Sequence, residues 1–295
     1  MNGAQTAFLP DGRLHLHHGP MDLIVTAEGP GSDAAHEAAI KRFATILGQL
    51  VDELPELRRP WHEGRTFGGT VARAMETATL HFLPDFITPM AAVAGAVADE
   101  ILSVMASTAP LARAIVNNGG DIALHLAAGQ TATFAIAGLP GSRITLRHED
   151  PWRGLATSGW RGRSHSLGIA DHVTVIARTA AEADAAATMI ANAVDLPGHP
   201  AIERKPASQL SPDSDLGTRP VTTDVGPLTR VETARALDHG HAAAGAAVTR
   251  GLAGGVLMAL NGEVRVAGTV PAIALPTGHP LEHEPIQSIR EALHA

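Results

Sequence analysis

The sequence predicts an α+β fold in which a mainly antiparallel sheet packs against long helices. Of the 295 residues, 45% are hydrophobic and 18% are charged, which is enough apolar material for a large core. Short strand-like runs alternate with long helical patterns, without the regular strand-helix rhythm of a doubly wound sheet. No long polar linker interrupts the chain. We therefore expect one domain over residues 1–295.

The first part of the chain reads as strands followed by helices. Residues 5–27 alternate between apolar and polar side chains and contain the turn Pro10-Asp11-Gly12, which predicts a set of short strands. Ser32 or Asp33 can cap a helix that is expected to end before Pro55. Two further helices are predicted over residues 70–82 and 91–105.

The region 86–200 carries most of the motifs and mixes strands with helices. Strands are predicted at 112–116, 122–126, 131–136, 143–147, 155–157 and 172–177, and a helix at 180–193. Residues 197–227 contain several prolines and little periodicity, so we expect a long ordered loop or an arm.

The C-terminal part, residues 228–268, is expected to contain a helix and a hairpin. The helix covers about 228–252, and the strands 256–260 and 263–267 flank Asn261-Gly262, a dipeptide typical of a type I′ turn.

Charge and composition exclude several classes of protein. The net charge is −8 and aromatic residues make up only 3%, so we expect no nucleic-acid partner. The absence of cysteine excludes thiol nucleophiles, disulfides and Cys-type zinc sites.

Two stretches of the sequence indicate where in the cell the protein is expected. The most apolar one, Met90 to Ala98, is followed by two acids and is shorter than the roughly 20 residues a membrane span needs. The start of the chain lacks a basic segment followed by an apolar run. We therefore expect a cytoplasmic protein without a membrane partner.

The first candidate site is the strand-to-turn segment Asn118-Gly119-Gly120-Asp121. Two glycines let the backbone turn with positive φ and come close to a ligand, and successive amides in such a turn can hold an anion. An ordinary tight turn explains the same residues equally well. We expect at least one of the glycines to have positive φ or to pack against the ligand.

The second candidate site is the Gly-punctuated loop from Ala156 to His165. It gathers hydroxyls, two guanidinium groups and an imidazole, which suits a phosphate or pyrophosphate ligand beside a proton acceptor. We favour this interpretation over a solvated loop, because sites are often carried on loops. The residues that would hold the cofactor are Thr157, Ser158, Gly159, Arg161 and Arg163, and His165 would act in catalysis.

Asp184 and Thr188 form the third candidate. They lie four residues apart in the predicted helix 180–193, so both oxygens face the same side and could share Mg²⁺. From these two residues alone, an acid near a helix N-terminus is the better explanation. The histidines at 15, 17 and 18 suggest metal capture, but no further ligand marks a zinc site.

Taken in order, these elements resemble the ApbE superfamily, whose best-known members are flavin transferases that move FMN from FAD onto a threonine hydroxyl of a target protein. A closer resemblance is to an uncharacterised branch of that superfamily and extends over most of the chain, in 86–95, 116–122, 156–168 and 192–200. The elements shared with the superfamily are Gly95 to Asp99, Asn118 to Asp121, Ala156 to Gly159, Ser164-His165, Val173 to Val175, and Ala183-Asp184 with Thr188.

The resemblance implies an ApbE-like domain and assigns roles. Asp184 and Thr188 would bind Mg²⁺, with a backbone carbonyl near Gly95 as a further ligand. The turn from Asn118 to Asp121 would line a flavin or nucleotide pocket, and His165 would be the base. The transferases usually have a lysine where this chain has Ala94, and an aspartate-proline pair where it has Ser166-Leu167-Gly168.

Three hypotheses follow. The first is a Mg²⁺-dependent enzyme that acts on FAD or a related dinucleotide, as a flavin or nucleotidyl transferase or by cleaving the pyrophosphate. The second is a protein that binds a flavin, pterin or purine-type ligand without transfer, which the missing lysine motivates. The third is an assembly partner in cofactor synthesis. The partner is expected to be a small nucleotide-type molecule, and the oligomeric state is left open, with a homodimer as one option.

Overall fold

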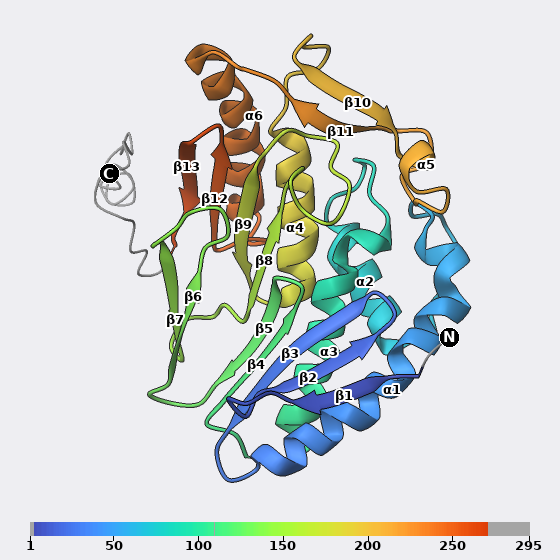
Figure 1. Ribbon diagram of the computed structural model, residues 1–295, viewed down its shortest axis with the longest axis vertical. Coiled ribbons are helices and arrows are strands. Elements are labelled where there is room, and N and C mark those ends of the chain that lie inside the picture. Colours follow the sequence, from blue (N-terminus) through green and yellow to red (C-terminus); the bar gives the residue numbers. More distant parts are fainter. Residues whose placement is uncertain (1–2, 109, 271–295) are drawn as a thin grey trace.

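The computed structural model describes residues 3–108 and 110–270 (Figure 1). The rest of the predicted domain over 1–295 lies outside the described residues. The main element of the described part is a nine-stranded sheet in which every pair of neighbouring strands is antiparallel. In spatial order the strands are β1 (Gln5–Phe8), β2 (Leu14–His18), β3 (Met21–Glu28), β4 (Arg113–Asn118), β5 (Asp121–Leu126), β8 (Gly154–Ser158), β9 (His172–Ala177), β12 (Gly255–Leu260) and β13 (Glu263–Gly268).

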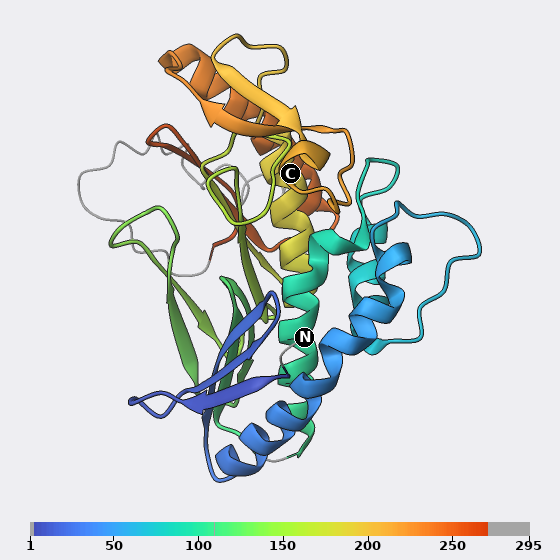
Figure 2. The ribbon, with the colours of Figure 1, turned by 45° about the vertical axis from the view of Figure 1, so that its right-hand side comes forward.

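Helices cover one face of this sheet (Figures 1 and 2). Helix α3 packs on β4 and β5, α4 on β8 and β9, and α6 on β12 and β13, while α1 and α2 pack against α3. Apolar and polar side chains alternate along the strands, which explains why the helices cover one face. In β2, Leu14 and Leu16 are fully buried under the helices, whereas His15 and His17 point to the opposite face. The helices are α1 (Ser32–Leu57), α2 (Thr70–Leu80), the short 3₁₀ helix η1 (Pro89–Ala92), α3 (Val93–Thr108), α4 (Ala180–Ala193) and α6 (Arg230–Thr249).

The hairpin of β6 (Thr131–Ala135) and β7 (Arg143–Arg147) lies on the opposite face. Its buried Ile144 and Leu146 form a core cluster with Leu124, Leu155 and Leu257 of the sheet. The C-terminal half of the sheet is therefore buried on both faces, and the expected α+β architecture with a mainly antiparallel sheet is confirmed.

Two expectations about single elements are wrong. Residues 197–227 are not a loop, because they contain the antiparallel ribbon of β10 (Ile202–Pro206) and β11 (Pro220–Val225), with the short helix α5 (Ala207–Leu210) between them. The strands are five and six residues long and are bounded by prolines, so they are too short to show periodicity.

Helix α1 passes through Pro55 and ends only at Leu57. In the last turn a proline removes only one intrahelical hydrogen bond. Leu57 is fully buried, and its packing stabilises the last turn of the helix in spite of that loss. The predicted helix 180–193 and the hairpin around Asn261-Gly262 are confirmed, with φ of 50° and 79° at the two turn residues.

Among the described helices, the stretch Pro89–Thr108 is long and apolar enough to cross a membrane by length and composition alone, with a mean hydropathy of 1.5. In the structure it packs against α1, α2, α4 and the sheet. The core helix of a globular domain has the same properties.

Candidate functional site

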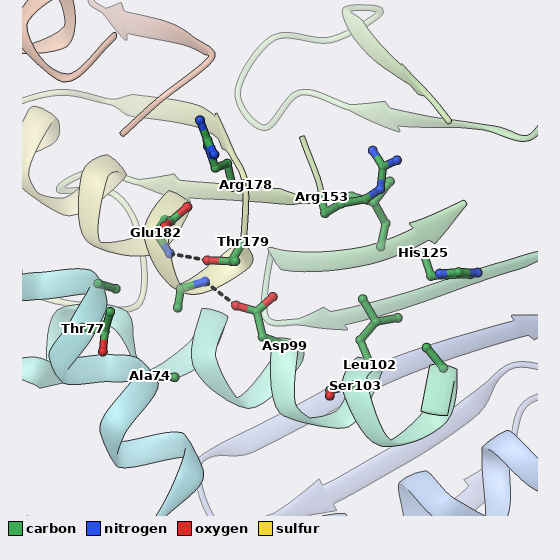
Figure 3. A pocket seen from close by; sticks show the side chains of 14 residues that line it. Ala74, Thr77, Asp99, Leu102, Ser103, His125, Arg153, Arg178, Thr179 and Glu182 are labelled. Atoms are coloured by element: carbon green, nitrogen blue, oxygen red, sulfur yellow. Dashed lines mark hydrogen bonds between the residues drawn. The ribbon is translucent and has the colours of Figure 1, made fainter. Parts of the chain in front are cut away.

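The site is organised by the close crossing of α3 and α4. A Cβ atom on Gly95 of α3 would lie 2.2 Å from the carbonyl oxygen of Ala180, so only glycine permits this approach. Asp99, one turn further along α3, accepts hydrogen bonds from two backbone N–H groups at the start of α4, that of Ala180 (2.9 Å) and that of Ala181 (2.8 Å), the second of which is drawn in Figure 3. Asp99 therefore caps α4.

Asp184 of α4 binds the start of α3 in the same way, through a backbone N–H group. Its Oδ2 accepts a hydrogen bond of 3.1 Å from the N–H of Gly95, near the start of α3. Burial raises the pKa of Asp184 well above its ordinary value, and the charge of Asp121 raises it further, while the N–H groups of Gly95 and Ala94 oppose the shift. Thr188 lies one turn later in α4 and is half-buried.

Asp121 supplies a second carboxyl group to the same place. It is the first residue of β5, and burial raises its pKa to about 7, while the nearby backbone N–H of Thr157 opposes the shift. Two carboxylates that repel each other in a low-dielectric site are costly to keep charged. Such a pair is typical of a site that receives a cation or a proton.

The turn between β4 and β5 holds Asp121 in place. Gly119 and Gly120 have φ of 66° and 115°, as expected from the sequence, and the N–H of Gly120 donates a 2.8 Å hydrogen bond to Oδ1 of Asn117. The buried Asn118 donates from Nδ2 to the carbonyl of Ala94 at 3.1 Å. The turn is thereby tied to the start of α3, beside Asp184.

The predicted loop begins at the end of β8. Thr157 shares a 2.9 Å hydrogen bond between its hydroxyl and that of Thr174, and Ser158 is half-buried. A Cβ on Gly159 would lie 2.3 Å from the carbonyl oxygen of Asp171, so this glycine serves the packing of the loop.

The two predicted anion-binding arginines have different surroundings. Nε of Arg161 lies 2.6 Å from Oδ1 of Asp171, and its guanidinium stacks on Trp160 at 4.5 Å. The guanidinium of Arg163 borders the glycine turn, since Nη1 would be 3.1 Å from a Cβ on Gly119. Arg163 is thus the arginine nearer to the Asp121 turn, and binding of an anion by either stays a prediction.

The segment after β10 adds residues that the sequence analysis did not assign to the site. Nε2 of the half-buried His165 lies 3.2 Å from Oγ of Ser211, at the end of α5. Thr88, just before η1, donates from its hydroxyl to Asp215. Ser211 and Asp215 lie far from His165 and Thr88 in the sequence, so no local pattern marked these partners.

A family model described as "AbpE bacteria" matches residues 6–266. The chain belongs to this family. Relatives named UPF0280 protein include one from Methanopyrus kandleri, 34% identical over 58% of this chain and 69% of the relative. The relative from Methanothermobacter thermautotrophicus is 42% identical over 38% of this chain and 44% of its own length, and that from Methanothrix thermoacetophila is 39% identical over 37% and 46%. The last two matches thus span less than half of each relative.

Among solved structures, the apo form of the Pseudomonas stutzeri flavinyl transferase ApbE matches over 91% of this chain and 97% of that one. The TM-score is 0.42 and the sequence identity 13%.

The residues present fit a hard divalent cation better than zinc. Within the part of the chain that the structure describes, no three His, Cys, Asp or Glu side chains are grouped to hold a metal ion. Mg²⁺ does not require such a group, because it keeps several waters and uses one or two carboxylates. The carboxylates of Asp121 and Asp184, which raise each other's energy when charged, match that donor set.

Proposed function

We propose that this member of the AbpE bacteria family binds FAD or a related dinucleotide together with Mg²⁺, and that it cleaves or transfers at the pyrophosphate. The observation that carries the proposal is that Asp184 and the turn ending in Asp121 both bind the start of α3, Asp184 through the N–H of Gly95 and the turn through Asn118 and the carbonyl of Ala94. Asp184 accepts a hydrogen bond from the N–H of Gly95, so this acid is oriented before a ligand arrives.

These two acids and the hydroxyl of Thr188 would hold the cation. Bound there, Mg²⁺ would neutralise the charge that develops on the pyrophosphate. The glycine turn presents backbone without side chains, so a phosphate or a flat ring can approach it closely. Arg163, which borders that turn, would supply positive charge to a phosphate in a chain of net charge −8.

His165 is the proposed base. Its Nε2 already lies within hydrogen-bond distance of a hydroxyl, that of Ser211. In transfer, the acceptor oxygen would form a bond to the FMN phosphorus, the P–O–P linkage would break, and AMP would leave while the proton passes to His165. In hydrolysis, water would take the place of the acceptor.

The test compares Asp184→Asn with Asp52→Asn, an exposed control on α1. Wild type and the control should show a Mg²⁺-dependent rise in melting temperature and should release AMP from FAD. Asp184→Asn should lose the Mg²⁺ effect, and its rate of AMP release should fall by at least about 100-fold, since even residues outside the first coordination shell cost 10–100-fold. Equal behaviour of the two variants would remove Asp184 from the metal site.

A second candidate function, binding of a flavin, pterin or purine-type ligand without transfer, has its own support. The segment Ser166-Leu167-Gly168, which replaces the aspartate-proline pair, serves the fold: Leu167 donates its N–H to Asn192 at 2.9 Å, and a Cβ on Gly168 would lie 2.1 Å from the carbonyl of Ala191. A yellow protein that releases no AMP would favour this second function.

A further inference from the structure

A separate cavity of about 520 Å³ lies where α4 begins, and it includes none of the site residues expected from the sequence (Figure 3). Its volume is in the range of small-molecule sites. Small and apolar side chains from α2 and α3 form one wall, among them Ala78 and Leu102. Arg153, Arg178, Asp99 and Glu182 supply charged groups, and Asp99 is already bound by the N–H groups of Ala180 and Ala181.

The two arginines bring positive charge without a carboxylate partner among the described residues. Arg153 is held by backbone carbonyls only: Nη1 donates to Asp150 and Trp152, and Nη2 donates to His148. Three of its five N–H donors are used in this way, which fixes the guanidinium and leaves the others available. Arg178, in the turn before α4, is exposed.

Glu182 shows that a hydrogen-bond donor is missing from the cavity. Its Oε2 is buried and has no hydrogen-bond partner in the part of the chain that the structure describes. Arg178 stands four residues before it, yet the two side chains form no ion pair within that part. A buried carboxylate oxygen without a donor is costly, and a ligand that brings one would remove the cost.

We propose that this cavity is a second ligand site, for a small molecule that has an apolar body, one acidic group and one hydrogen-bond donor. The acidic group pairs with Arg178 and Arg153, the donor reaches Glu182, and the body covers the wall around Leu102. A bare inorganic anion would leave the apolar wall and Glu182 unused. A polyphosphate would place several negative charges beside Glu182 and Asp99.

The probe is 8-anilinonaphthalene-1-sulfonate, which has an aromatic body, a sulfonate and an N–H group. We expect saturable binding with one dye per chain, measured by fluorescence titration of the full chain. Arg178→Gln should weaken it about tenfold, the usual effect of losing a charge-assisted hydrogen bond. Arg143→Gln, which removes an exposed arginine of β7, is the matched control and should bind as wild type does.

Ala74→Trp is the second variant, because Ala74 lines the wall on α2 and a large ring there would fill the cavity. Thermal melts check that each variant is folded. Loss of binding in Ala74→Trp together with weaker binding in Arg178→Gln supports the site. No saturable binding to wild type, or equal binding by Arg178→Gln and Arg143→Gln, overturns it. Because neither variant touches Asp121 or Asp184, this result is independent of the proposed function.

Discussion

Replacing Gly95 by alanine tests the helix crossing on which the site depends. A Cβ at this position would lie 2.2 Å from the carbonyl oxygen of Ala180 and 2.4 Å from its carbonyl carbon, where real Cβ contacts stay above 3.0 Å. Both atoms belong to the backbone, so no side chain can rotate away. The start of α4 must move, and overpacking of this kind costs about 1–3 kcal/mol.

The same movement disturbs hydrogen bonds. Asp99 accepts from Ala180 and Ala181, and Asp184 accepts from Gly95 itself. Weakening a hydrogen bond to a charged group costs about 1.5–3 kcal/mol. We therefore expect Gly95→Ala to lower the free energy of unfolding by about 3 kcal/mol or more. For a chain of this size, that lowers the melting temperature by about 6 °C.

The control is Gly48→Ala on α1, where a Cβ would meet no atom within 4 Å. There alanine should stabilise the protein by about 0.5–1 kcal/mol, because glycine is a poor helix former. Both free energies come from urea or thermal unfolding followed by circular dichroism. A Gly95→Ala variant that melts within about 1 °C of wild type would show that the crossing is looser than described.

Three further predictions concern the site. Burial raises the pKa of Asp121 to about 7, so the folded state keeps a proton that the unfolded chain has released. In metal-free buffer the stability of wild type should therefore fall as pH rises from about 4 to 7, and Asp121→Asn should show on the order of 3–4 kcal/mol less of this fall by denaturant titration. Gly120→Val should abolish FAD binding, because its side chain would fill the space beside the turn, where a Cβ meets no atom within 4 Å. It should cost about 1–3 kcal/mol of stability, because φ is 115° at this position. Full affinity in a folded variant would show that the segment is an ordinary turn. Arg163→Ala should weaken FAD binding about tenfold in calorimetry, and more than Arg161→Ala, whose guanidinium already has a carboxylate partner; unchanged affinity in both would make the arginines surface residues.

The fold was predictable where a local signal dominates. Helix α4 shows an unbroken alanine-rich pattern after Thr179, whose side chain caps it by accepting from the N–H of Glu182. The last hairpin depends on two adjacent turn residues. The β10–β11 ribbon was missed because its stability comes from distant contacts, such as the 2.8 Å hydrogen bond from the hydroxyl of Thr222 to the carbonyl of Gly168.

The site was predictable only in part, for a similar reason. The motifs indicated Asp121 and Asp184 separately, in a turn and in a helix. Their proximity depends on contacts across long stretches of sequence, since Gly95 and Asp184 are 89 positions apart and Asp99 and Ala180 are 81 apart. No local pattern encodes such a pairing. The partners of His165 and Thr88 were missed for the same reason.

A carboxylate of each of the helices α3 and α4 binds the start of the other helix, and these contacts link stability to the proposed chemistry. Each helix starts with N–H groups that have no partner within the helix, and each receives a carboxylate from the other helix: Asp99 binds the start of α4, and Asp184 the start of α3. Asp99 is satisfied by two backbone donors, so it serves the fold. Asp184 accepts a hydrogen bond from one backbone donor, the N–H of Gly95, at 3.1 Å. Asp184 also lies beside the turn that carries Asp121, which Asn118 ties to the carbonyl of Ala94, so the proposed cation site is assigned to Asp184 and not to Asp99.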